Sequence, residues 1–134
     1  MTALLSPRPW MALAALFGAT GVAAGAYGWH GLEADETVRE IFQIAVQYQM
    51  WHAMALIGVA WRCSVGRKSA QFAAAAGVLF GLGIILFSGN LYVFALTGEL
   101  PISGGAPAGG FCLIAGWIAL GVSAFVGGDN NTGN

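Results

Sequence analysis

The chain has 134 residues, of which 57% are apolar and only 8% are charged, and its net charge is −1. A soluble globular domain carries roughly 25% charged residues, so a chain this poor in charge cannot cover a surface that faces water. Lipid must therefore cover most of it, and the near-neutral charge gives no basis for binding nucleic acid. The length is enough for one domain, which we take as 1–134.

Four apolar runs follow one another and predict helices at approximately 9–29, 38–62, 70–96 and 106–126. Each run reaches the roughly 20 residues that a helix needs to cross a hydrocarbon core of about 30 Å. Helices are favoured because their backbone groups pair within the segment. The first run is too long for the apolar core of a signal peptide. We therefore expect an all-α membrane protein, a bundle of four transmembrane helices.

Local signals mark where the first two helices begin. Pro9 suits a first helical turn, where its missing N–H is not needed. Thr37 and Glu40 have the spacing of a capping box, which predicts that the second helix starts in water at Val38.

Charged residues are divided between the two sides of the membrane that four spans would create. One side carries Arg8, Arg62, Arg67 and Lys68, together with the polar tail 129–134. The other carries Glu33, Asp35, Glu36, Glu40 and Glu99, with Arg39 as its single basic residue. Because loops rich in Lys and Arg stay in the cytoplasm, both termini are expected there. Aromatic residues near the span ends predict interfacial anchors: Trp10, Trp29, Trp61 and Tyr92.

Glycines are too numerous, at 21, to serve loops alone. Helical spacing places them on stripes that let two backbones approach closely in lipid: Gly18, Gly21, Gly25 and Gly28 on the first helix, Gly77 and Gly81 on the third, and Gly116 on the fourth. These stripes predict a compact bundle. One of them could also be a docking face for another membrane protein.

Polar side chains within the spans are the first place to look for function. On the second helix, Tyr48, Gln49 and His52 fall within an arc of about 100°. Ser88 and Asn90 on the third helix complete a candidate cluster in the outer half of the membrane. Gln43 and Gln47 lie on nearly the opposite side of the second helix, with Gln43 near the outer head groups.

His52 has several interpretations. The simplest is a neutral histidine that hydrogen-bonds to Ser88 or Asn90. The others are contact with a lipid, quinone or other amphiphile, a metal or haem ligand, and a proton relay. His30 falls at the outer end of the first helix, roughly 10–15 Å from the midplane, so the two histidines poorly suit one haem iron.

His30 itself is interpreted as part of a helix C-terminus, with Gly31 past the end and a possible outer-face contact to head groups or a partner. The cluster brings no carboxylate or thiolate that would make a metal site, and we expect no cofactor. Cys63 and Cys112 should lie near opposite faces of the membrane as free thiols.

Four ordered stretches resemble one family. They are Gly25–Leu32 (GAYGWHGL), Ala45–Ala53 (AVQYQMWHA), Phe87–Tyr92 (FSGNLY) followed by Leu96–Gly98 (LTG), and Gly104–Gly110 (GGAPAGG) followed by Gly116–Trp117. Together they resemble domain-of-unknown-function family 423, which includes the transmembrane protein 256-like small integral membrane proteins. Asn90 replaces a serine of the family pattern, and Trp51 replaces a tyrosine. The resemblance implies a four-span protein of the bacterial inner (plasma) membrane, and it implies no settled activity.

Three functions follow as hypotheses. The first is a non-enzymatic accessory or structural subunit that packs against a larger membrane complex, such as a respiratory or energy-coupling assembly, or against copies of itself. The second is a lipid or small-molecule binder or carrier, with its pocket at the polar cluster. The third is an intramembrane enzyme or redox protein, which is least favoured because the sequence offers no nucleophile–histidine–acid set and no charge inside any span.

Overall fold

The computed structural model describes residues 2–126, and every described element is helical. A short 3-10 helix, η1 (Thr2–Leu5), precedes four α-helices: α1 (Pro7–His30), α2 (Glu36–Val65), α3 (Arg67–Thr97) and α4 (Gly105–Phe125). This confirms the all-α prediction. The polar tail 129–134 lies outside the described residues.

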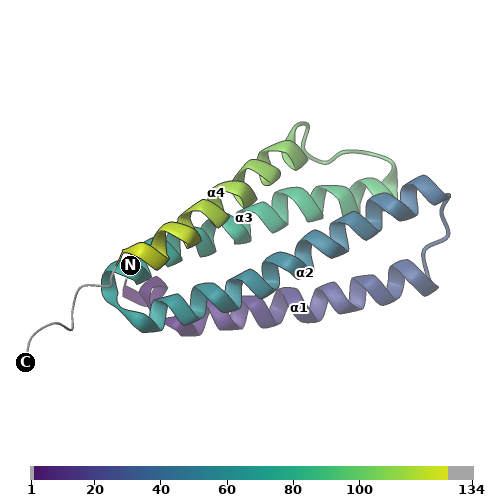
Figure 1. The fold of residues 1–134 in the computed structure, drawn as a ribbon. Helices are drawn as coiled ribbons and strands as arrows, with labels where there is room; N and C mark the ends of the chain where they lie inside the picture. Colours follow the sequence, from purple (N-terminus) through teal and green to yellow (C-terminus); the bar gives the residue numbers. More distant parts are fainter. Residues whose placement is uncertain (1, 127–134) are drawn as a thin grey trace, which may run out of the picture.

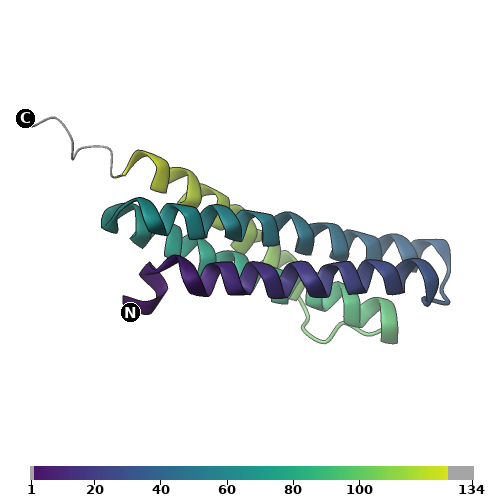
Figure 2. The same ribbon diagram turned by 90° about the horizontal axis from the view of Figure 1, so that it is seen from below.

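The four helices run up and down beside one another (Figure 1). Helix α1 packs on α2, α2 on α3, and α3 on α4, while α1 and α4 share no comparable contact. Figure 1 shows α1 and α4 on opposite sides of α2 and α3, and in the view from below α1 and α2 lie in front of α3 and α4 (Figure 2). The bundle is therefore open between α1 and α4, and α2 contacts a neighbour on each side.

The helix ends differ in detail from the sequence-based expectation. Helix α2 begins at Glu36, because Asp35 is its N-cap and its carboxylate accepts from the backbone N–H of Val38 at 2.9 Å. The capping box expected at Thr37 is thus wrong, since an aspartate two residues earlier caps the same turn. Pro9 lies in the first turn of α1, as predicted, behind an N-cap at Ser6.

Glycines allow the backbones of α3 and α4 to pack closely together. A Cβ added at Gly109 would lie 2.5 Å from the backbone nitrogen of Phe87, and one at Gly83 would lie 2.3 Å from Leu113. A Cβ added at Gly116 would likewise lie 2.7 Å from the ring of Phe80. Side chains larger than hydrogen would separate these helices, which explains the glycines here in physical terms.

The glycines of α1 do not all serve packing. Gly21 and Gly28 lie against Met50 and Phe42 of α2, at 2.5 and 2.9 Å from an added Cβ. Gly25 has ordinary room, with Val46 at 3.5 Å, and Gly18 has nothing within 4 Å. At 100° per residue Gly18 is turned about 60–80° away from Gly21 and Gly28, so its assignment to the packing stripe within the chain is wrong.

On α3, Gly77 lies beneath Trp10 of α1, with the indole 2.6 Å from an added Cβ, whereas Gly81 has room beside Leu13 at 3.5 Å. Trp10 is only 4% exposed and donates to the carbonyl oxygen of Leu4 in η1. It is therefore a core residue, and its prediction as an interfacial anchor is wrong. Trp29 and Trp61 remain largely exposed.

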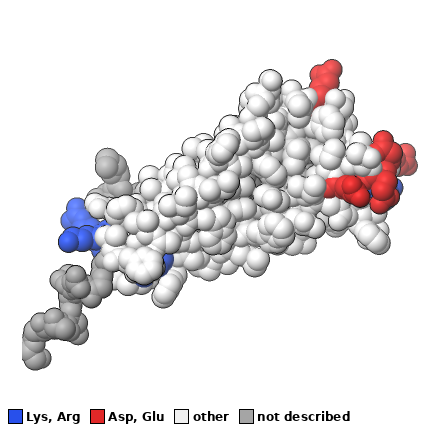
Figure 3. All heavy atoms as spheres, turned by 45° about the horizontal axis from the view of Figure 1, so that its top comes forward, with Lys and Arg blue, Asp and Glu red and all other residues white. Residues whose placement is uncertain are grey.

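Charge is segregated at the two ends of the molecule (Figure 3). By length and composition, α1, α3 and α4 could each cross a membrane. Helix α2 is not among these three, because three glutamines and a histidine lower its mean hydropathy and its charged side chains lie near its two ends.

Candidate functional site

His52 of α2 is buried, with 4% exposure, and both its ring nitrogens have partners. Nδ1 lies 2.6 Å from the carbonyl oxygen of Tyr48, one turn earlier. Nε2 accepts from the indole N–H of Trp117 on α4 at 3.1 Å. The expected partners Ser88 and Asn90 are not those that His52 uses, because this face of α2 is turned toward α4 as well as α3.

Gln49 lies three residues earlier on α2, about 60° around the helix from His52, and its partners lie on α1 and α3. Its amide nitrogen donates to the carbonyl oxygen of Phe17 at 2.8 Å and to Oγ1 of Thr20 at 2.9 Å, both on α1. Its amide oxygen accepts from the hydroxyl of Tyr92 on α3 at 2.9 Å. Gln49 therefore links three helices, and Tyr92 serves this network in place of the interfacial role predicted for it.

Asn90 of α3 is 3% exposed and holds the loop before α4. Its side-chain nitrogen donates to the carbonyl oxygen of Ile102 at 2.9 Å, and its side-chain oxygen accepts from the backbone N–H of the same residue at 3.2 Å. Gly105 leaves room for this amide, since an added Cβ would lie 2.7 Å from it. Asn90 thus acts as a two-point clamp on the loop.

Ser88 and Tyr48 complete the predicted cluster. The hydroxyl of Ser88 is buried and has no hydrogen-bond partner among the described residues. Tyr48 is half-buried and stacks on Phe87 with ring centroids 4.5 Å apart. The five residues predicted to share a pocket are therefore divided among separate helix contacts, with Gln49 turned toward α1, His52 toward α4 and Asn90 toward the loop.

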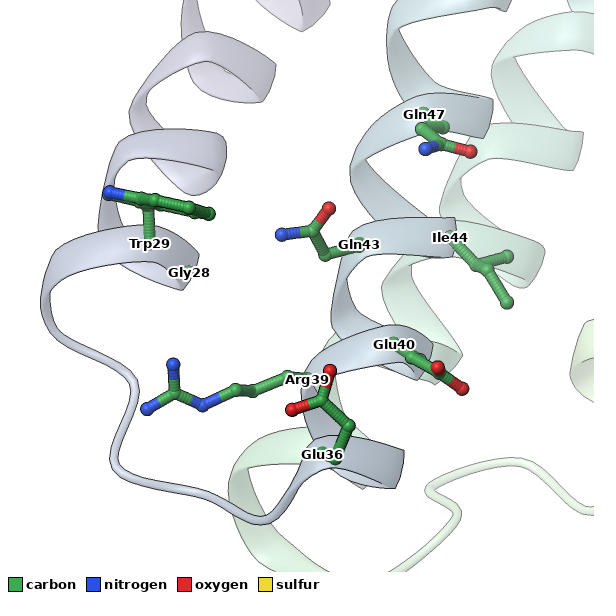
Figure 4. A pocket seen from close by; sticks show the side chains of 8 residues that line it. All are labelled: Gly28, Trp29, Glu36, Arg39, Glu40, Gln43, Ile44 and Gln47. Carbon is green, nitrogen blue, oxygen red and sulfur yellow. The ribbon is translucent and has the colours of Figure 1, made fainter.

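A groove of about 530 Å³ does open elsewhere, between the C-terminal end of α1 and the N-terminal end of α2. Its lining combines both signs of charge, two amides and apolar side chains: Gly28, Trp29, Glu36, Arg39, Glu40, Gln43, Ile44 and Gln47. Figure 4 shows Gln43 and Arg39 reaching from α2 toward the α1 side, where Trp29 forms the opposite wall. We call this the outer groove.

Two of the lining residues, Gln43 and Gln47, are exposed one turn apart on the same side of α2. Side chains of α2 that hydrogen-bond within the described chain include Arg39, Gln49, His52, Arg62 and Ser64. Neither Gln43 nor Gln47 does so, and both amides are therefore available to a molecule outside the chain.

A sequence signal for this groove exists. Gln43 and Gln47 fall on the side of α2 nearly opposite to the arc of Tyr48, Gln49 and His52, and the acidic residues Glu36 and Glu40 precede them with helical spacing. In the sequence, these acidic residues predicted only the orientation in the membrane, and the two glutamines were assigned no role. These residues become one surface only when α1 brings Trp29 alongside.

His30 is the last residue of α1 and is exposed; the backbone N–H groups of Gly31 and Leu32 both donate to the carbonyl oxygen of Tyr27. Within residues 2–126, no three His, Cys, Asp or Glu side chains come together as a metal site. Cys63 and Cys112 are free thiols.

Comparison with known proteins gives a consistent result. The profile of a family described as "Protein of unknown function (DUF423)" matches residues 24–110. A UPF0382 membrane protein of Staphylococcus haemolyticus is 37% identical over 115 residues, covering 84% of this chain and 92% of the relative. The UPF0382 membrane protein YwdK of Bacillus subtilis is 33% identical, covering 87% and 96%. The UPF0382 inner membrane protein YgdD of Escherichia coli is 32% identical, covering 90% and 92%. No solved structure matches.

Proposed function

Because this chain belongs to the DUF423 family, whose relatives are named as membrane proteins, we propose that it is a non-enzymatic accessory subunit that packs against another integral membrane protein chain. The family confirms the resemblance seen in the sequence. The accessory role is supported by the surface of α1 and α2.

One observation carries the proposal: the amides of Gln43 and Gln47 are exposed in the outer groove and have no hydrogen-bond partner among the described residues. Gly25 packs beside Val46, so Gln47 lies level with Gly25, about 7–8 Å inside the end of α1 at His30. An amide placed in hydrocarbon without a hydrogen bond costs several kcal/mol. A neighbouring chain with polar groups at that depth removes this cost.

The proposal includes four spans with both termini in the cytoplasm. Helix α2 lies between α1 and α3, and residues 41–61 carry no charged side chain. Its lower hydropathy comes largely from Gln43, Gln47, Gln49 and His52. Gln49 and His52 are paired inside the chain, so Gln43 and Gln47 are the polar side chains that a partner covers. The basic end of the molecule is the cytoplasmic one.

The open side of the bundle supports the same role. Gly18 is half-buried on α1, and a Cβ added there would have no atom of the neighbouring helices within 4 Å. Its small size therefore serves no contact within the chain. In lipid, small residues at a helix surface allow another helix to approach closely. Gly18 and the two amides together therefore suit a partner helix laid along α1 and α2.

Photocross-linking in native membranes tests the proposal. A benzophenone amino acid is placed at Gln47, and a control probe is placed at Phe111, a 73%-exposed residue of α4. We expect a protein adduct from the Gln47 probe and none from the Phe111 probe. Adducts to lipid alone from the Gln47 probe would contradict the accessory role and favour a lipid-binding protein, whose head group would lie in the outer groove.

A further inference from the structure

We infer that the partner on the α1–α2 surface is a second copy of this chain, related by a two-fold axis along the membrane normal. This inference rests on the proposed function and names its partner. A two-fold interface presents the same patch from both chains, so each group must complement itself or a near neighbour.

The amides of Gln43 and Gln47 meet that condition. A carboxamide has two N–H donors and one carbonyl acceptor, so two glutamines facing each other across an axis can each donate to the other. Two copies inserted in the same orientation place Gln47 opposite Gln47 at the same depth. A carboxylate or an ammonium at these positions would face its own charge and repel the second copy.

The charged end of the outer groove, formed by Glu36, Arg39 and Glu40, can also pair with a second copy of itself. Arg39 lies on α2 between Glu36 and Glu40, within one turn of each. A two-fold axis beside this turn sets the arginine of each copy opposite the acidic residues of the other. Surface ion pairs of this kind contribute little binding energy. They do disfavour other alignments of the two α2 helices, in which like charges would face each other.

The proposed contact surface continues along α2, beyond the outer groove. Met54 lies seven residues after Gln47 on the same stripe and is 60% exposed. On α1, Gly18 leaves open space beside this stripe. The surface therefore extends from the charged end of the groove to the middle of the membrane, as a helix–helix contact between two copies requires.

Disulfide trapping in native membranes tests the inference. Cys63 and Cys112 are first replaced by alanine, and a single thiol is then placed by Gln47→Cys, Met54→Cys or, as control, Phe111→Cys on α4. With a membrane-permeant oxidant we expect a reducible dimer from Gln47→Cys and Met54→Cys and only monomer from Phe111→Cys. Two separate thiols guard against a variant that fails to insert.

Energy transfer between labelled copies gives the strength of the association. We expect Gln43→Leu together with Gln47→Leu to weaken self-association roughly 3–30-fold for each interhelical hydrogen bond lost. The control Ile114→Leu, at an exposed position of α4, should leave it unchanged.

The outcomes separate the inference from the proposed function. A Gln47→Cys adduct to a different membrane protein, with no dimer of this chain, overturns the second copy and keeps the accessory role. If the Gln47→Cys and Met54→Cys chains remain monomeric and the Gln47 photoprobe reaches only lipid, both are overturned. A dimer from Phe111→Cys as efficient as that from Gln47→Cys overturns the inference, because the contact would then have no defined surface.

Discussion

Trp117 of α4 donates its indole N–H to Nε2 of His52 on α2 across 3.1 Å, while Nδ1 of the same imidazole lies 2.6 Å from the carbonyl oxygen of Tyr48. A carbonyl oxygen only accepts hydrogen bonds, and an indole N–H only donates. The imidazole must therefore donate through Nδ1 and accept through Nε2. This arrangement satisfies the neutral ring completely and leaves no free nitrogen for a metal or haem.

We expect His52 to be the neutral Nδ1–H tautomer. Nitrogen-15 NMR of histidine-labelled protein in lipid measures this directly, because the protonated and unprotonated ring nitrogens differ widely in chemical shift. His30 is exposed at the end of α1 and serves as the internal reference. A dominant Nε2–H form of His52, or no change in the signal of Nε2 after Trp117→Phe, would contradict the assignment.

The Gln49 network predicts coupling between α1, α2 and α3. Interhelical hydrogen bonds in membranes contribute roughly 0.6–2 kcal/mol each. Tyr92→Phe removes one bond to Gln49, so we expect a loss in that range. Gln49→Leu removes three and should cost two to three times as much.

Unfolding of the purified protein by denaturing detergent measures these losses in a double-mutant cycle. Once Gln49 is leucine, the further change Tyr92→Phe should cost almost nothing, because the hydroxyl has already lost its acceptor. Equal effects of Tyr92→Phe with and without Gln49 would show that the two side chains act independently.

Gly109 and Gly81 predict opposite results for the same substitution. A Cβ at position 109 would lie 2.5 Å from the backbone nitrogen of Phe87 and cannot be accommodated by a side-chain rotation. We expect Gly109→Ala to cost about 1–3 kcal/mol or more of stability. Gly81→Ala meets only Leu13 at 3.5 Å, so stability should be unchanged or rise by up to about 1 kcal/mol. Thermal unfolding in detergent compares them, and similar losses at both positions would contradict the α3–α4 contact.

Sequence alone predicted the helices well, because their apolar runs and end signals are local. It placed Tyr48, Gln49 and His52 on one arc of α2, which is correct as geometry. Their partners could not be predicted, since an arc of about 100° on a central helix reaches two different neighbours. Thr20 was a usable signal, as the one polar interruption of the first apolar run, and it accepts from Gln49.

The glycine stripes show the same limit. Spacing puts Gly18, Gly21, Gly25 and Gly28 within about 80° of one another, but the contact with α2 is narrower than this arc. Only the rotation of α1 about its axis decides that Gly21 and Gly28 lie in the contact and Gly18 outside it. That rotation depends on the packing of large side chains such as Met50 and Phe42, which come from another helix.

The proposed topology predicts which positions a reagent can reach from outside the cell. In a chain whose Cys63 and Cys112 are alanine, Glu99→Cys lies in the loop after α3 and Lys68→Cys near the start of α3. A membrane-impermeant maleimide added to intact cells should label Glu99→Cys only, and Lys68→Cys should react after permeabilisation. Labelling of Lys68→Cys alone in intact cells would contradict the proposed topology, because it requires either the reverse orientation or an α2 that does not cross the membrane. Labelling of both positions would show that α3 does not cross.

Asn90 predicts how the loop between α3 and α4 is held. Its amide binds both the N–H and the carbonyl oxygen of Ile102, and a serine side chain at this position would be too short to reach both. We expect Asn90→Ser to speed backbone hydrogen exchange in 98–104 and to lower stability by about 1 kcal/mol. Leu96→Ser, at a 54%-exposed site on the last turn of α3, is the control that should leave exchange in the loop unchanged. Unaltered exchange after Asn90→Ser would mean that the loop is held by its own backbone turns and not by the side chain beneath it.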